Sequence, residues 1–85
     1  MGPPHAQGFM GVTSTMDRRK FGLGFLKGRA DSFRRGLLTI AHVEGAANMA
    51  ARYGVADHDI AAMLIVYGLA WDGSRRAVTT SETPL

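Results

Sequence analysis

The chain contains no cysteine among its 85 residues. This absence excludes a disulfide framework and any thiolate metal site, and it fits a reducing compartment. The N-terminal sequence lacks the basic start and the apolar core of a signal peptide, and it does not match a myristoylation pattern. The sequence therefore leaves the localisation unassigned, consistent with the cytoplasm or a virion.

Apolar runs long enough to cross a membrane are also lacking. The most apolar stretch, Ile60–Trp71, contains twelve residues without a charge. As a helix it would be about 18 Å long, whereas a membrane span needs about 20 residues to cross about 30 Å. We expect no transmembrane span in this chain.

Signatures of catalysis and of metal binding are absent as well. His42, Asp57, His58 and Asp59 lack the spacing of a zinc site, and no Gly-x-Ser-x-Gly motif surrounds a serine. The glycine-rich stretch at residues 22–28 lacks the Gly-Lys-Ser/Thr ending of a phosphate-binding loop. We predict a protein that is not an enzyme, with no catalytic residue, no metal site and no cofactor.

The most informative stretch that is present is the apolar one. Asp57 or Asp59 can cap a helix over about 58–71, and Asp72-Gly73 is a stop signal. A strand over 63–67 is the alternative, but the alanines around it favour a helix. The helix would be apolar nearly all round, and a small fold has little capacity to bury it. We therefore predict an interface with a protein partner or a second copy of the chain. Its residues are Ile60, Met63, Leu64, Ile65, Val66, Tyr67, Leu69 and Trp71.

The remaining patterns predict an all-α fold. Asp31-Ser32 resembles an N-cap, and it is followed by helical spacing that predicts a long helix over about 31–53. Gly54 has the position of a C-terminal glycine in a left-handed conformation, with Val55 as the apolar contact after it. A marginal basic helix from about Thr15 would precede the long one, weakened by three internal glycines. We expect an extended arm over 1–13, one helical domain over 14–73 and a polar tail over 74–85.

Positive charge is concentrated in one segment. Between residues 17 and 36 there are seven cations and two anions, which gives +5 against a net charge of +3 for the chain. A solvated face that meets an acidic protein, a phosphate-binding surface and a membrane-surface helix with interleaved phenylalanines are the three interpretations. The candidate contact residues are Arg18, Arg19, Lys20, Lys27, Arg29, Arg34 and Arg35.

The link between the two later helices has the spacing of a helix-turn-helix, with Ala50, Gly54, Val55, Ile60 and Met63 in the packing positions. The second helix would offer aspartates to the DNA phosphates, which favours a simple αα-hairpin.

From the apolar helix and the extended arms together, we expect a small non-enzymatic structural or accessory subunit of a larger assembly, such as a virion or another multi-subunit particle. The alternatives are a helix-turn-helix-like or non-specific DNA-binding protein and a basic amphipathic protein of the membrane surface.

Overall fold

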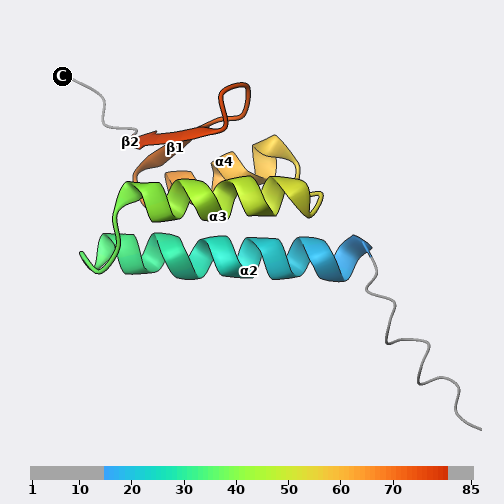
Figure 1. The fold of residues 1–85 in the computed structure, drawn as a ribbon, viewed down its shortest axis with the longest axis horizontal. Helices are drawn as coiled ribbons and strands as arrows, with labels where there is room; N and C mark the ends of the chain where they lie inside the picture. Colours follow the sequence, from blue (N-terminus) through green and yellow to red (C-terminus); the bar gives the residue numbers. More distant parts are fainter. Residues whose placement is uncertain (1–14, 81–85) are drawn as a thin grey trace, which may run out of the picture.

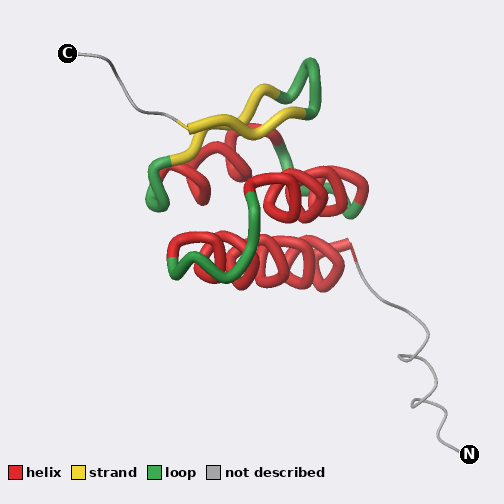
Figure 2. Tube along the Cα trace, turned by 60° about the vertical axis from the view of Figure 1, so that its left-hand side comes forward, coloured by secondary structure: helices red, strands yellow, loops and turns green. Residues whose placement is uncertain are grey.

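The computed structural model describes residues 15–80, which form three helices and one two-stranded hairpin (Figure 1). The elements follow one another as α2 (Thr15–Arg34), α3 (Ile40–Arg52), α4 (Asp57–Ile65), β1 (Leu69–Asp72) and β2 (Ala77–Thr80). Helices α2 and α3 lie side by side, and the hairpin lies on the far side of α3 from α2 (Figures 1 and 2). The predicted all-α class is therefore correct for most of the chain and wrong for the hairpin.

Helix α2 is one continuous element of 20 residues, whereas the sequence predicted a marginal helix. Gly22, Leu26 and Ala30, four residues apart, are buried in it. A Cβ added at Gly22 would lie 3.1 Å from the Cα of Ala50, so this glycine lets α2 and α3 approach closely. Packing of this face outweighs the propensity cost of the glycines. Residues 1–13, for which an extended arm was predicted, lie outside the described residues, as does Ser14.

The predicted helix over 31–53 is wrong in its first third. Asp31 and Ser32 belong to the last turn of α2, which ends at Arg34 and is followed by Gly36 with φ +80. The amide of Leu37 donates to the carbonyl of Ser32 at 2.9 Å, and the amide of Gly36 donates to that of Phe33 at 2.9 Å. This pair of bonds is a Schellman motif, which satisfies the last carbonyls of α2.

Helix α3 then begins after Thr39. The backbone amide of Thr39 donates to Nδ1 of His42 at 3.3 Å, and the Thr39 hydroxyl lies 3.0 Å from the same nitrogen. His42 therefore has a capping role in this fold. The helix ends as predicted, because Gly54 adopts φ +95 and the amide of Val55 donates to the carbonyl of Ala50 at 3.0 Å.

Helix α4 is shorter than the predicted helix over 58–71. It ends at Ile65, and the chain turns through Gly68, whose φ is +76. Strand β1 then pairs antiparallel with β2, from Leu69 opposite Thr80 to Asp72 opposite Ala77. Asp72 is therefore the last residue of β1, and Gly73 begins the turn of a hairpin. Residues 77–80 of the predicted polar tail form β2, and residues 81–85 lie outside the described part.

Side chains of α3 hold the free edge of β2. The backbone amide of Val78 donates to Oε2 of Glu44 at 2.9 Å, and Nδ2 of Asn48 donates to the carbonyl of Arg76 at 3.0 Å. The Val78 amide of β2 and the Arg76 carbonyl directly before β2 thus find partners on α3. This contact explains why a hairpin with strands of only four residues is stable here.

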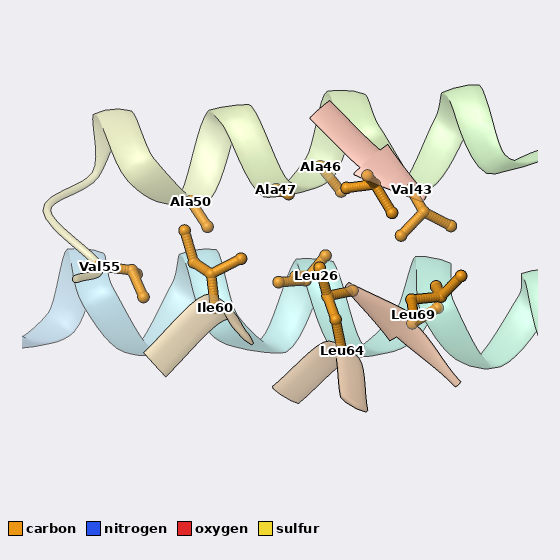
Figure 3. Packing of buried hydrophobic residues seen from close by; sticks show 11 residues of the cluster. Leu26, Val43, Ala46, Ala47, Ala50, Val55, Ile60, Leu64 and Leu69 are labelled. Carbon is orange, nitrogen blue, oxygen red and sulfur yellow. The ribbon is translucent and has the colours of Figure 1, made fainter. Parts of the chain in front are cut away.

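The core lies between α2, α3, α4 and the start of β1 (Figure 3). Its largest fully buried side chains are Leu26, Val43, Ile60, Leu64 and Leu69. Alanines of α3 form much of the opposing wall, so the large side chains of α4 and β1 fill the space that the alanines leave. The chain thus buries much of its apolar segment by itself.

Candidate interaction surfaces

The residues predicted as an interface are divided by the fold into three groups. Ile60, Leu64 and Leu69 are at most 1% exposed and belong to the chain's own core. Met63, Tyr67 and Trp71 are half-buried against that core. Ile65 and Val66 are 63% and 65% exposed. A partner can therefore reach the C-terminal end of α4 and the turn after it.

We name Ile65, Val66 and Tyr67 the α4-end patch. Arg34, from the last turn of α2, places its guanidinium carbon 5.6 Å from the centre of the Tyr67 ring. The patch thus combines two exposed aliphatic side chains and one aromatic ring, with one cation, Arg34, beside it. Tyrosine and arginine are enriched at the energetic centres of protein interfaces.

The predicted basic residues all lie on α2 or directly after it, but they do not form one surface. Arg35 pairs with Asp31 at 3.4 Å, with both side chains well exposed. Arg34 lies against Tyr67, as described above. Arg18 lies 5.5 Å from the centre of the Tyr53 ring, and Arg29 lies 4.7 Å from that of Phe25. Arg19, Lys20 and Lys27 are exposed.

Two of these cations end a row of side chains that we name the α2 ladder, namely Arg18, Tyr53, Phe21, Phe25 and Arg29. The Phe21 ring centre is 5.7 Å from that of Tyr53 and 6.4 Å from that of Phe25. The spacing of four from Phe21 to Phe25 to Arg29 is a signal that the sequence contains. Tyr53 joins the row only through the packing of α3 on α2, so the sequence alone did not indicate the complete ladder.

A groove of about 530 Å³ continues from the ladder along the C-terminal half of α2. It is lined by Gly24, Phe25, Gly28, Arg29, Ser32, Leu37 and Leu38. A Cβ added at Gly24 or Gly28 would meet no atom within 4 Å, so the packing of the chain does not require glycine at either position. The groove shares Phe25 and Arg29 with the ladder.

The α3–α4 connection has the four residues and the turn glycine of a helix-turn-helix. The first turn of α4 exposes Asp57, His58 and Asp59, with the His58 ring 3.4 Å from Asp59. Neither predicted aspartate caps the helix, because the N-cap is Ala56 and no side chain caps there. These carboxylates would face DNA phosphates with like charge.

Asp72, directly before the hairpin turn, has a lowered pKa. The Ser74 hydroxyl donates to Oδ1 of Asp72 at 2.7 Å, and the backbone amide of Arg75 donates to the same atom at 3.3 Å. The Ser74 hydroxyl is the largest cause that lowers the pKa of Asp72 below its ordinary value of 3.8, and the Arg75 amide is the next. Hydrogen bonds to the ionised carboxylate favour that form.

Residues 15–80 contain no group of three or more His, Cys, Asp or Glu side chains that could hold a metal ion. None of the described helices is both long enough and apolar enough to cross a membrane, as the sequence predicted. Comparisons of the chain with models of protein families, with curated proteins and with solved structures give no match.

Proposed function

We propose that the protein is a non-enzymatic accessory or structural subunit of a larger assembly, such as a virion or another multi-subunit particle, and that it docks through the α4-end patch. The observation that carries this proposal is the exposure of Ile65 and Val66, at 63% and 65%, directly beside core residue Leu64. Adjacent exposed aliphatic side chains with an aromatic neighbour are typical of a protein-binding surface.

The small size of the α4-end patch determines how much additional surface a partner has to bury. Full burial of an isoleucine or a valine side chain contributes about 1.5–3 kcal/mol. A stable interface buries at least about 1,000 Å² in total, which is more than three side chains provide. The α4-end patch would therefore be the energetic centre of a larger contact, with Arg34 at its rim.

The test is to replace Ile65 and Val66 together by lysine and to measure the mass in solution by sedimentation velocity. Both side chains are exposed, so the double variant should fold, and its free energy of unfolding should lie within about 1 kcal/mol of that of the natural chain. The natural chain should sediment as an oligomer or with a co-purifying partner, and the variant as a monomer without a partner.

The matched control is Ala41→Lys, which adds a charge at an exposed position of α3. This control should leave the mass in solution unchanged. A natural chain that is monomeric at high concentration and purifies without a partner would contradict the proposal. So would a double variant that retains its partner.

A further inference from the structure

The α2 ladder places cations against aromatic rings instead of against carboxylates. The guanidinium carbon of Arg29 lies 4.7 Å from the centre of the Phe25 ring, and that of Arg18 lies 5.5 Å from the centre of the Tyr53 ring. Within residues 15–80, neither arginine forms an ion pair. Their positive charges are therefore available to an anionic ligand.

The middle ring of the row is open to a ligand as well, and Phe25 and Tyr53 beside it are half-buried. Phe21, in the middle of the row, is 57% exposed although it is a large apolar side chain. A row of three aromatic rings with an arginine at each end matches the two parts of a nucleotide, because bases stack on rings and cations neutralise phosphates. A row of this kind therefore fits a chain of unpaired nucleotides.

The dimensions agree with this ligand. From Arg18 to Arg29 the helix rises about 17 Å, which corresponds to about five stacked nucleotides at about 3.4 Å each. The groove of about 530 Å³ continues the row and has an apolar wall formed by Leu37 and Leu38. Gly24 and Gly28 leave the backbone of α2 open to close approach by a ligand.

We propose that the α2 ladder and the adjoining groove bind single-stranded nucleic acid without sequence preference. Phe21 and Phe25 stack on bases, and Arg18 and Arg29 contact phosphates. A duplex hides the faces of its bases and so cannot use the rings. A lipid surface has no side chain to insert into the recess at Gly24 and Gly28, so it does not use that recess. This site is separate from the α4-end patch and does not depend on it.

The experiment uses the full chain and fluorescein-labelled strands of about 15 nucleotides, with fluorescence anisotropy as the readout. Oligothymidylate, oligouridylate and a DNA duplex of equal length are compared at about 50 and about 200 mM salt. Both single strands should bind at least about tenfold tighter than the duplex. Comparison of the affinities for the two single strands shows whether DNA or RNA is the preferred ligand.

Variants then separate stacking from simple charge attraction. Phe21→Leu keeps an apolar side chain and removes the ring, and it should weaken single-strand binding about tenfold. Phe21→Trp should preserve the binding. Arg29→Gln should weaken binding and lower the slope of log affinity against log salt by about 0.7. Lys27→Gln removes the same charge at an exposed position outside the ladder and the groove, and is the matched control.

Each result decides the proposal once circular dichroism has shown that the variants fold. Tight single-strand binding that depends on Phe21 and Arg29 more than on Lys27 supports it. Equal affinity for the duplex overturns it, and so does an equal loss with Lys27→Gln, because either result means diffuse attraction of a polyanion. Absence of single-strand binding, or preferred binding to vesicles of anionic lipid that depends on Phe21, overturns it as well. None of these results depends on Ile65 or Val66, so the proposed subunit role is tested separately.

Discussion

The indole Nε1 of Trp71 donates a hydrogen bond to Oδ1 of Asp57 at 2.9 Å and thereby joins β1 to the first turn of α4. Gly73 lies against the same carboxylate, since a Cβ there would come within 2.5 Å of Oδ2. Both contacts fix the hairpin relative to α4. Asp57 thus serves the fold at a position where the sequence predicted only a helix cap.

Asp57→Ala should lower the free energy of unfolding by about 1–2 kcal/mol, because the indole loses its charged acceptor. Urea denaturation should show the lower midpoint with an unchanged slope. Asp59→Ala is the control, because Asp59 pairs with the exposed His58, and this variant should change stability by less than about 0.5 kcal/mol. Equal losses for the two variants would show that the Trp71 bond does not stabilise the hairpin.

Glu44 should be required for the second strand. In Glu44→Ala the buried amide of Val78 loses its acceptor, which should cost about 1–3 kcal/mol. Glu44→Gln keeps a side-chain oxygen at that place and should cost less. Hydrogen exchange of the Val78 amide is the direct measurement, and fast exchange in the alanine variant alone is the expected result. Slow exchange in both variants would mean that the amide has another acceptor.

The hairpin turn should weaken in acid. Because the pKa of Asp72 is lowered in the fold, its contribution to stability is present above the ordinary value of 3.8 and is lost as the pH falls through the folded-state pKa. Titration of the Asp72 carboxyl carbon by NMR should give a pKa below 3.8. Ser74→Ala should raise that pKa, since the Ser74 hydroxyl is the largest cause of the shift, while Ser32→Ala should not change it. A pKa that stays the same in Ser74→Ala would refute this cause.

The parts of the fold that the sequence predicted are those with local signals. The turn at Gly54 has its glycine and its apolar contact, Val55, next to each other in the sequence, and both act as predicted. The break after Arg34 was missed because Asp31-Ser32 resembles a stronger helix start than Thr39. Gly36, the glycine that follows α2, is a weaker signal in the sequence than that apparent cap.

The hairpin was missed for a different reason. Its strands have four residues each, and the side chains that hold β2 come from α3. Glu44 and Val78 are 34 residues apart, and Asn48 and Arg76 are 28 residues apart. No local pattern encodes such contacts. The contact of Tyr53 with the rest of the α2 ladder is likewise not encoded by a local pattern. The exposure of Ile65 and Val66 depends on which face of α4 the core uses.

Gly54 and Gly45 provide a test of the turn in which the same substitution has opposite effects. Gly54 has φ +95, where a side chain with a Cβ costs about 1 kcal/mol or more, so Gly54→Ala should destabilise the protein. Gly45 lies inside α3, and a Cβ there would meet no atom within 4 Å, so Gly45→Ala should stabilise by up to about 1 kcal/mol. Thermal denaturation of both variants should therefore show melting temperatures that move in opposite directions. A rise for Gly54→Ala would mean that α3 continues through this residue, and the faces of α3 and α4 that form the core would then not meet.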